Sequence, residues 1–282
     1  MQPKPLERKL HMEYGINIRF FEKELGLKRA AELVAKAGFT QLDYTPPVLE
    51  DTWKEQMTEA AKIFADNGLT VHQTHAPFNR YGRYGALHKT CIDRCVETVE
   101  FFGAKFMVAH GDEFDFEHLT FSPEAALDYN YQYYLPYVER AKANGYKVAF
   151  ETVFEDGSRR RYTSKADELM DLIMAFNNET VVCCWDFGHA NVSFRKEAPD
   201  QVRRFGSLIQ CTHLHDNSGI DAHQMPMTGD INWKATMQAF HAVGYNGVMS
   251  VEYSHGSMPA CLTEEFINLT YKAASYAWEL GV

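Results

Sequence analysis

The chain has 282 residues, a formal net charge of −10 and 45% hydrophobic residues, a composition typical of a folded globular protein. This charge provides no broad basic surface, so a nucleic-acid partner is not expected. The first residues lack the apolar core of a signal peptide and no stretch reaches eighteen consecutive apolar residues, which predicts a cytoplasmic protein outside the membrane.

Short runs of β-branched and aromatic residues alternate with longer amphipathic segments eight times along the chain. Repeated βα units predict parallel strands joined by helices. Eight units without a linker-like break predict one domain over residues 1–282, an α/β fold of the (β/α)₈ TIM-barrel type, with about residues 1–12 as an N-terminal extension. The strands are expected at residues 13–20, 40–45, 69–75, 104–110, 147–153, 181–187, 209–215 and 247–253.

The segments between these strands are predicted to be helices, and six of the eight end in glycine, which is common just past a helix C-terminus. They span residues 23–38, 53–68, 87–103, 123–145, 164–178, 199–206, 232–244 and 263–280.

Six cysteines are present, but their spacing is not that of a disulfide framework. Cys183 and Cys184 are adjacent, and Cys91 and Cys95 follow a helical pattern. The sequence therefore predicts reduced, mostly buried thiols.

Polar residues gather where the predicted strands end, which is where barrels of this type build their active sites. Within "LIQCTHLH", His213 and His215 are at i and i+2 and would project from the same side of a sheet. Burying polar side chains there costs free energy unless they bind a partner, so a functional role is expected. Seven of the twelve histidines lie at or just beyond a strand end, namely His75, His110, His189, His213, His215, His223 and His255.

Each of the last four predicted strands contributes one candidate metal ligand: Glu151, Asp186, His213 and Glu252. Neighbouring strands would bring them around one point, where three carboxylates without a counter-charge would repel one another. A divalent cation removes that conflict, so the sequence predicts a site for Mn²⁺, Mg²⁺, Co²⁺ or Zn²⁺.

Two further features have open interpretations. The run "SRRRY" holds Arg159, Arg160 and Arg161, which form either a solvated charged surface or an anion-binding loop. The aromatic residues Phe78, Trp185 and Phe187 could line a substrate pocket, although packing against the barrel is expected for at least two of them.

The motifs "THAPF", "FET", "WDFGHAN", "HLHDNSGIDAH", "GDINW" and "VEY" span nearly the whole chain. In order and spacing they resemble the xylose isomerase-like TIM-barrel superfamily, which includes sugar epimerases and isomerases, inosose-processing enzymes and endonuclease IV. The resemblance implies a metal held by Glu151, Asp186, His213 and Glu252, with both glutamates moving protons. The chain departs from the ketose epimerases in two places: "VFEDGS" replaces a second glutamate, and Gly219 lies near an expected arginine.

The leading prediction is a metal-dependent isomerase or epimerase of a carbohydrate, in which Glu151 and Glu252 act as base and acid on an enediolate. His189 would orient a substrate hydroxyl. A lyase acting on an inosose or related keto sugar uses the same chemistry and stays open, and self-association into a homo-oligomer is an open possibility.

The resemblance to endonuclease IV implies a further alternative, an enzyme with additional metal ions that cleaves phosphodiesters. In that case His189, Asp221 and His223 would hold a second cation; otherwise they would only bond one another and fix the loop. The residues matching its metal-binding positions are His75, His110, Glu151, Asp186, His189, His213, Asp221, His223 and Glu252.

Overall fold

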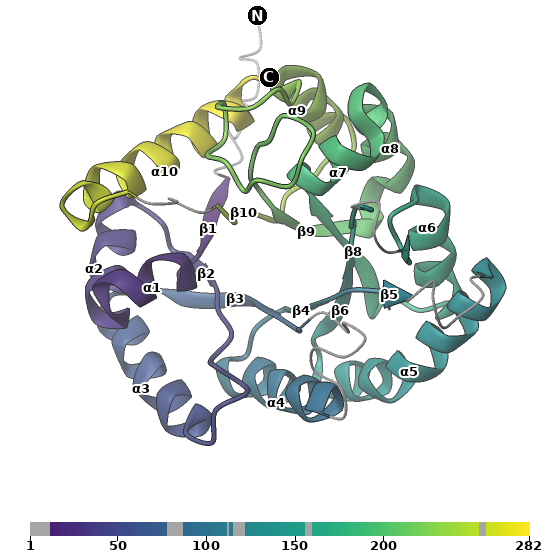
Figure 1. The fold of residues 1–282 in the computed structure, drawn as a ribbon, viewed down its shortest axis with the longest axis horizontal. Coiled ribbons are helices and arrows are strands. Elements are labelled where there is room, and N and C mark those ends of the chain that lie inside the picture. Colours follow the sequence, from purple (N-terminus) through teal and green to yellow (C-terminus); the bar gives the residue numbers. More distant parts are fainter. Residues whose placement is uncertain (1–11, 78–86, 112, 115–121, 156–159, 254–257) are drawn as a thin grey trace, which may run out of the picture.

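Eight parallel strands form the wall of a barrel in the computed structural model, with helices around it (Figure 1). The structure describes residues 12–77, 87–111, 113–114, 122–155, 160–253 and 258–282. The predicted fold class is confirmed. The wall strands are β1 (Glu13–Asn17), β2 (Gln41–Asp43), β3 (Thr70–His75), β4 (Phe106–Ala109), β6 (Lys147–Glu151), β8 (Val181–Asp186), β9 (Ile209–His213) and β10 (Val248–Val251).

The barrel closes between β9 and β10 through Leu214, which lies between His213 and His215 in the sequence. Leu214 N donates to Ser250 O at 2.7 Å, and Glu252 N donates to Leu214 O at 3.1 Å. The carbonyl ends of all wall strands then face one rim of the barrel, because the strands are parallel. Closure therefore fixes the backbone of Glu252 beside that of His213.

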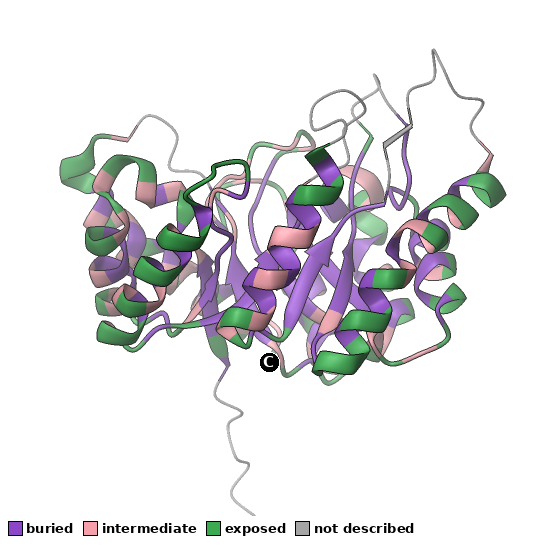
Figure 2. Cartoon of the chain, turned by 90° about the horizontal axis from the view of Figure 1, so that it is seen from below, coloured by how far each residue is buried: buried purple, intermediate pink, exposed green. Residues whose placement is uncertain are grey.

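Amphipathic helices cover the wall with their buried faces inward and their exposed faces outward (Figure 2). Among the described residues, none of the helices combines the length and apolar character needed to cross a bilayer. Their bounds are α1 (Arg19–Leu25), α2 (Leu27–Ala37), α3 (Trp53–Asp66), α4 (Leu87–Phe102), α5 (Pro123–Asn144), α6 (Ala166–Ala175), α7 (Phe187–Phe194), α8 (Ala198–Phe205), α9 (Trp233–Ala242) and α10 (Thr263–Glu279), with 3₁₀ turns at η1 (Arg195–Glu197), η2 (Gly206–Leu208) and η3 (Ala260–Leu262).

The first βα unit differs from its prediction. The strand ends at Asn17, whose Oδ1 accepts from Arg19 N at 3.2 Å, and a short helix replaces the expected strand residues. The predicted helix 23–38 is divided at Gly26, which has a φ of 75°. A left-handed residue cannot continue an α-helix, so the amphipathic pattern across Gly26 belongs to two helices.

A small apolar cluster from four neighbouring strands is separate from the larger core under the helices. Five of the six cysteines are buried and none is in a disulfide, as predicted; Cys261 is exposed. The wall strands thus pack apolar side chains inside the barrel and carry polar side chains at their carbonyl ends. The separate cluster contains Phe106, Val108, Ala149, Val182, Cys184 and Cys211.

A two-stranded antiparallel sheet, β5 (Glu113–Phe114) with β7 (Arg160–Arg161), was not predicted. Arg160 and Arg161 are only 5% and 6% exposed, so the solvated interpretation of this charged run is wrong for both. Arg159 lies outside the described residues.

Candidate metal centre

Eight side chains line a cavity of about 190 Å³, and they come from segments far apart in the sequence. Wall strands β3, β6 and β10 supply residues at or just beyond their carbonyl ends, as the barrel prediction expected. The remaining residues come from the segments that follow β6, β8 and β9. The lining is His75, Glu151, Phe154, Arg161, His189, Asp221, His223 and Glu252.

Glu151 is at the centre of the site and is fully buried. Its Oε1 lies 2.7 Å from His213 Nδ1, and its Oε2 lies 3.4 Å from His75 Nε2 and in short contact with His110 Nε2. Glu252 Oε2 approaches the same His213 Nδ1 at 3.2 Å. His75, Glu151, His213 and Glu252, hereafter the inner cluster, have ligand atoms within 4.8 Å of one another.

His213 is oriented by a carboxylate that the sequence analysis missed. Its Nε2 lies 2.9 Å from Asp43 Oδ2, and the amide of Gln73 contacts both of these atoms, at 2.8 and 3.3 Å. A carboxylate only accepts, so both ring nitrogens carry protons in the metal-free protein, Nε2 toward Asp43 and Nδ1 toward Glu151 and Glu252. If Nδ1 bound a cation, Asp43 would keep the remaining proton on Nε2. Asp43 ends β2, so the strand-end rule that identified the other candidates would also have identified it.

Asp186 is near the inner cluster, but its closest partner is elsewhere. Its Oδ2 lies 3.9 Å from His213 Nδ1, while its Oδ1 lies 2.9 Å from His215 Nε2. Asp186 also caps α7, because Oδ1 accepts from His189 N at 2.6 Å. His215 approaches so closely that a Cβ at Gly188 would come within 1.9 Å of its ring, so only glycine fits there.

A second group of donors borders the first. His189 Nε2 and His223 Nε2 lie 3.7 and 3.4 Å from the two oxygens of Asp221, and the rings of His215 and His223 stack with centroids 4.1 Å apart. His223 has a φ of 42°, a conformation that is uncommon outside glycine and concentrates at functional sites. His189, His215, Asp221 and His223, hereafter the loop cluster, also have ligand atoms within 4.8 Å of one another.

Buried charges shift the pKa values of the inner cluster strongly. Burial acts to lower the pKa of His213, but Glu252, Glu151 and Asp43 outweigh it and raise that pKa well above its usual value. Burial acts to raise the pKa of Glu151, but His213 and His110 lower it well below its usual value. For His110, burial dominates and lowers the pKa to about 4.

The loop cluster shows the same pattern. Burial opposes the charged forms of its histidines, yet Asp186 and Asp221 raise the pKa of His189 to about 10. Asp221 and Glu252 raise that of His223 to about 9. Protons thus provide the positive charge that balances the carboxylates in both clusters, and a divalent ion would take their place.

Residues 212–233 divide into ligand candidates and structural residues. Asp216 accepts from Met227 N at 3.0 Å, Ile231 N at 3.3 Å and Trp233 Nε1 at 2.8 Å, which ties both ends of the loop together. The polar motif "GDINW" therefore shapes the loop that presents Asp221 and His223.

Arg160 and Arg161, the two described arginines of the charged run, have different surroundings. Arg160 bonds Ser164 Oγ at 2.7 Å and pairs with Glu155 and Glu168, so carboxylates of the chain surround it. Arg161 lines the site cavity and lies over the ring of Phe154, 4.5 Å from its centroid. Of the pair, only Arg161 is placed to meet a substrate.

Trp185 and Phe187 pack behind the barrel wall rather than in the site. Trp185 contacts the rings of Phe205 and Phe240, and Phe187 stacks on Phe240 and Trp233. Phe78 and His255 lie outside the described residues.

The donor set suits a divalent cation. Glu151 and Asp186 are fully buried, and Glu252 is 13% exposed in its side chain. With His213, these residues offer three carboxylates and one imidazole, a combination that suits Mn²⁺, Mg²⁺, Co²⁺ and Zn²⁺.

Comparison with known proteins identifies the fold and a family. Residues 31–273 match the family described as "Xylose isomerase-like TIM barrel". An uncharacterized protein of Methanocaldococcus jannaschii, MJ1311, is 25% identical over 186 residues, which is 63% of this chain and only 62% of that protein.

Solved structures with a similar fold include two epimerases. A D-psicose 3-epimerase superposes with a TM-score of 0.77 and 15% identity, covering 96% of this chain and 100% of that one. The 3-keto-D-glucoside 4-epimerase YcjR of E. coli superposes with a TM-score of 0.73 and 16% identity, covering 93% and 100%. At these identities the likeness establishes a common fold.

Proposed function

Because this chain belongs to the xylose isomerase-like TIM barrel family, we propose that it is a divalent-metal-dependent isomerase or epimerase of a carbohydrate. The observation that carries the proposal is the position of two glutamates. Glu151 and Glu252 both approach His213 Nδ1, at 2.7 and 3.2 Å, and both line the same cavity of about 190 Å³. This arrangement can hold one cation and one small polyhydroxylated molecule.

Glu151, Asp186, His213 and Glu252 would hold the metal. When bound, the metal would polarise a substrate carbonyl and its neighbouring hydroxyl and so acidify the C–H between them. Asp186 needs only a small adjustment to join the other three, since its Oδ2 is already 3.9 Å from His213 Nδ1.

Proton movement requires one group that removes a proton from carbon and another that returns it. Glu252 is the more accessible of the two glutamates, with 13% side-chain exposure against 1% for Glu151. It also lines the adjoining cleft beside His75. We assign Glu252 as the group that exchanges protons with the substrate most freely, and Glu151 as its partner on the opposite face.

The remaining cavity residues would select and orient the substrate. His189 Nδ1 lies 2.9 Å from Thr152 O, which leaves Nε2 directed at Asp221 and the cavity, in reach of a substrate hydroxyl. Arg161 supplies a fixed positive charge for a carboxylate, phosphate or carbonyl oxygen. Sugars, sugar phosphates and oxidised sugars all meet these requirements.

Free-ketohexose epimerisation is not the favoured form of this activity. Glu155, the acidic residue nearest the family's second glutamate, pairs with Arg160 and accepts from Ser164 Oγ at 2.9 Å. Gly219, near the expected arginine, has no side chain to bind a hydroxyl. The substrate is therefore expected to differ from a free ketohexose near these positions.

One observation favours a second function, metal-dependent hydrolysis of a phosphodiester as in endonuclease IV. The loop cluster provides three imidazoles and one carboxylate within 4.8 Å, enough for a second cation beside the first. Hydrolytic sites commonly use two metals to activate water and stabilise the leaving oxygen.

A deuterium-exchange screen in D₂O tests the proposal. The metal-loaded protein is incubated with ketoses, inososes and sugar phosphates, and recovered carbohydrate is examined by mass spectrometry. Deuterium on carbon without loss of water supports an isomerase or epimerase. Loss of water indicates the lyase, whereas cleavage of an abasic duplex with no exchange into any sugar indicates the hydrolase.

A further inference from the structure

Two buried asparagines of the sequence motifs are not among the candidate ligands. Asn191 is the last residue of "WDFGHAN", and Asn217 lies within "HLHDNSGIDAH". The first belongs to α7, which also carries His189, and the second lies near the start of the loop that carries Asp221 and His223. The two asparagines therefore lie on the two segments that meet to form the loop cluster.

The side chains of this pair join the two segments directly. Asn191 Nδ2 donates to Asn217 Oδ1 at 3.0 Å. Asn217 Nδ2 in turn donates to the backbone of α7, at Gly188 O, 2.8 Å away. Asn217 Oδ1 also accepts from Gly219 N at 3.0 Å, which shapes the first turn of the loop. Buried amides whose hydrogen bonds are satisfied in this way fix the relative position of the segments that they join.

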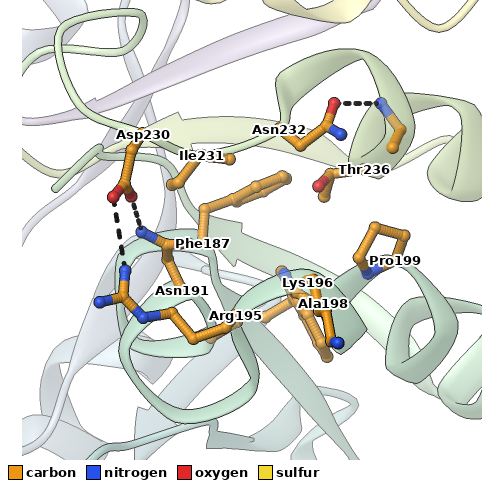
Figure 3. Close-up of a pocket in the computed structure, with 13 residues that line it drawn as sticks. Phe187, Asn191, Arg195, Lys196, Ala198, Pro199, Asp230, Ile231, Asn232 and Thr236 are labelled. Carbon is orange, nitrogen blue, oxygen red and sulfur yellow. Dashed lines mark hydrogen bonds and ion pairs between the residues drawn. The ribbon is translucent and has the colours of Figure 1, made fainter. Parts of the chain in front are cut away.

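The far end of the loop reaches the same pair. Asp230 Oδ1 accepts from Asn191 Nδ2 at 2.7 Å, and Asp230 N donates to Asn217 O at 2.9 Å. Figure 3 marks the contact between Asp230 and Asn191, together with a second contact from Arg195, whose Nη1 lies 3.4 Å from Asp230 Oδ2. One side chain of α7 thus binds both the beginning and the end of the loop.

The partners on the two sides of the loop cluster have different support. His189 is fixed from the barrel, because its N donates to Asp186 Oδ1 at 2.6 Å and its Nδ1 lies 2.9 Å from Thr152 O. Among the described residues, by contrast, the carboxylate of Asp221 contacts only the rings of His189 and His223. The distance of 3.7 Å between His189 Nε2 and Asp221 Oδ2 therefore depends on how the loop is held against α7.

We propose that Asn191 and Asn217 are positioning residues that hold the loop against α7, so that Asp221 faces His189 at the cavity. This inference rests on the proposed function, in which His189 orients a substrate hydroxyl. In the described part of the chain, no hydrogen bond joins either asparagine to the inner cluster. The pair therefore acts on substrate binding rather than on the metal or on proton transfer.

Asn191→Asp tests this with a nearly isosteric change. An oxygen replaces Nδ2 and faces the oxygens of Asn217 and Asp230, so the contact becomes repulsive. Hydrogen exchange of the metal-loaded full-length protein, followed by mass spectrometry, should be about tenfold faster over residues 218–230 and unchanged over β9. For each ketose, inosose or sugar phosphate that the unmodified protein turns over, KM should rise about tenfold and kcat should change less than about threefold.

Two further variants make this expectation specific. Asn191→Asp combined with Asp230→Asn exchanges the two groups, keeps the net charge and restores a donor to the contact, so it should recover most of the loop protection and most of the KM. Asn178→Asp is the matched control. It removes a donor to Phe176 O, 2.9 Å away, in the connection before β8 at the opposite end of the barrel, and should leave both measurements unchanged.

Faster loop exchange and a higher KM, both reversed by the combined variant, would establish the positioning role. Loop exchange equal to that of the unmodified protein overturns the proposal, and so does faster exchange with an unchanged KM. Asn191→Ala removes the same donors without repulsion and takes the place of Asn191→Asp if the latter does not fold. If the unmodified protein turns over none of these carbohydrates, the proposed function fails, and loop exchange alone decides whether the pair holds the loop.

Discussion

The inner cluster and the loop cluster both combine imidazoles with carboxylates but are held in different ways. Glu151 and His213 end wall strands and are fully buried, so barrel hydrogen bonds on both sides fix their backbones. Asp221 and His223 follow β9 in a loop, with side chains 21% and 26% exposed. The inner cluster is thus preorganised for a tightly held ion, whereas the loop cluster depends on the conformation of its segment.

The largest expected effect comes from removing a strand-end ligand. His213→Ala should leave a folded barrel with little bound metal and lower turnover at least about a thousandfold, since metal catalysis is worth several kcal/mol. Elemental analysis and circular dichroism, with the turnover assay, measure these effects. Chelator treatment of the unmodified protein should abolish activity as well.

The matched control for this variant is His72→Ala. His72 is also buried on a wall strand, but it lines a different cavity, together with Lys105 and Tyr245. The His72→Ala variant should therefore keep its bound metal. Full activity after exhaustive chelation would contradict the metal-dependent mechanism altogether.

Glu252→Gln should separate metal binding from proton transfer. Glutamine keeps the size and one oxygen donor but cannot accept a proton at neutral pH, so turnover should fall by about 10² to 10⁴ while the metal stays bound. Deuterium exchange at the substrate carbon should fall in parallel. Unchanged exchange in a metal-loaded variant would show that another group is the base.

Asp43→Asn tests the support behind the inner cluster. The amide can no longer hold the Nε2 proton of His213 as a carboxylate does, and loss of such a contact typically weakens metal binding about 10- to 100-fold. Competition with a chromogenic chelator measures this affinity. Affinity equal to that of the unmodified protein would mean that Asp43 serves only packing.

The repeated βα pattern was sufficient to predict the barrel, because each strand and helix carries its own periodic signal. All eight wall strands lie within the predicted ranges. The short sheet of β5 and β7 was missed because two-residue strands carry no periodicity. The division of the first helix at Gly26 depended on a backbone angle that composition does not reveal.

The candidate ligands could be predicted because parallel strands all end at the same rim of the barrel, which brings residues far apart in the sequence together. Asp43 also ends a strand and could have been found by the same rule, but its contact with His213 was harder to predict. Gln73 and Asp43 reach His213 from the opposite side of the barrel, and these contacts depend on register and on a bulge at Asp43. Likewise, Arg160 and Arg161 are neighbours in sequence, yet one is enclosed by carboxylates and the other lines the cavity.

His223→Ala would sharpen the contrast between the clusters. If the loop cluster only orients the loop and the substrate, the protein should keep about one tightly bound metal per chain, and turnover should fall less than about tenfold. Metal counting in both proteins measures this directly. Two or three ions in the unmodified protein, partly lost together with activity in the variant, would instead favour phosphodiester hydrolysis.

The smallest expected effect is a pH dependence of stability that arises from the loop cluster of the metal-free protein. The pKa of His223 rises to about 9 beside Asp221, above the ordinary histidine value of about 6.5. A raised folded-state pKa stabilises the protein below about 6.5, and this contribution is lost as the pH rises through about 9. Asp221→Asn should therefore lower the free energy of unfolding at pH 6.5, and the gap to the unmodified protein should narrow by pH 9.5. Urea denaturation at the two pH values, with chelator present, measures the gap. A gap of constant size would mean that Asp221 fixes the loop through neutral hydrogen bonds alone.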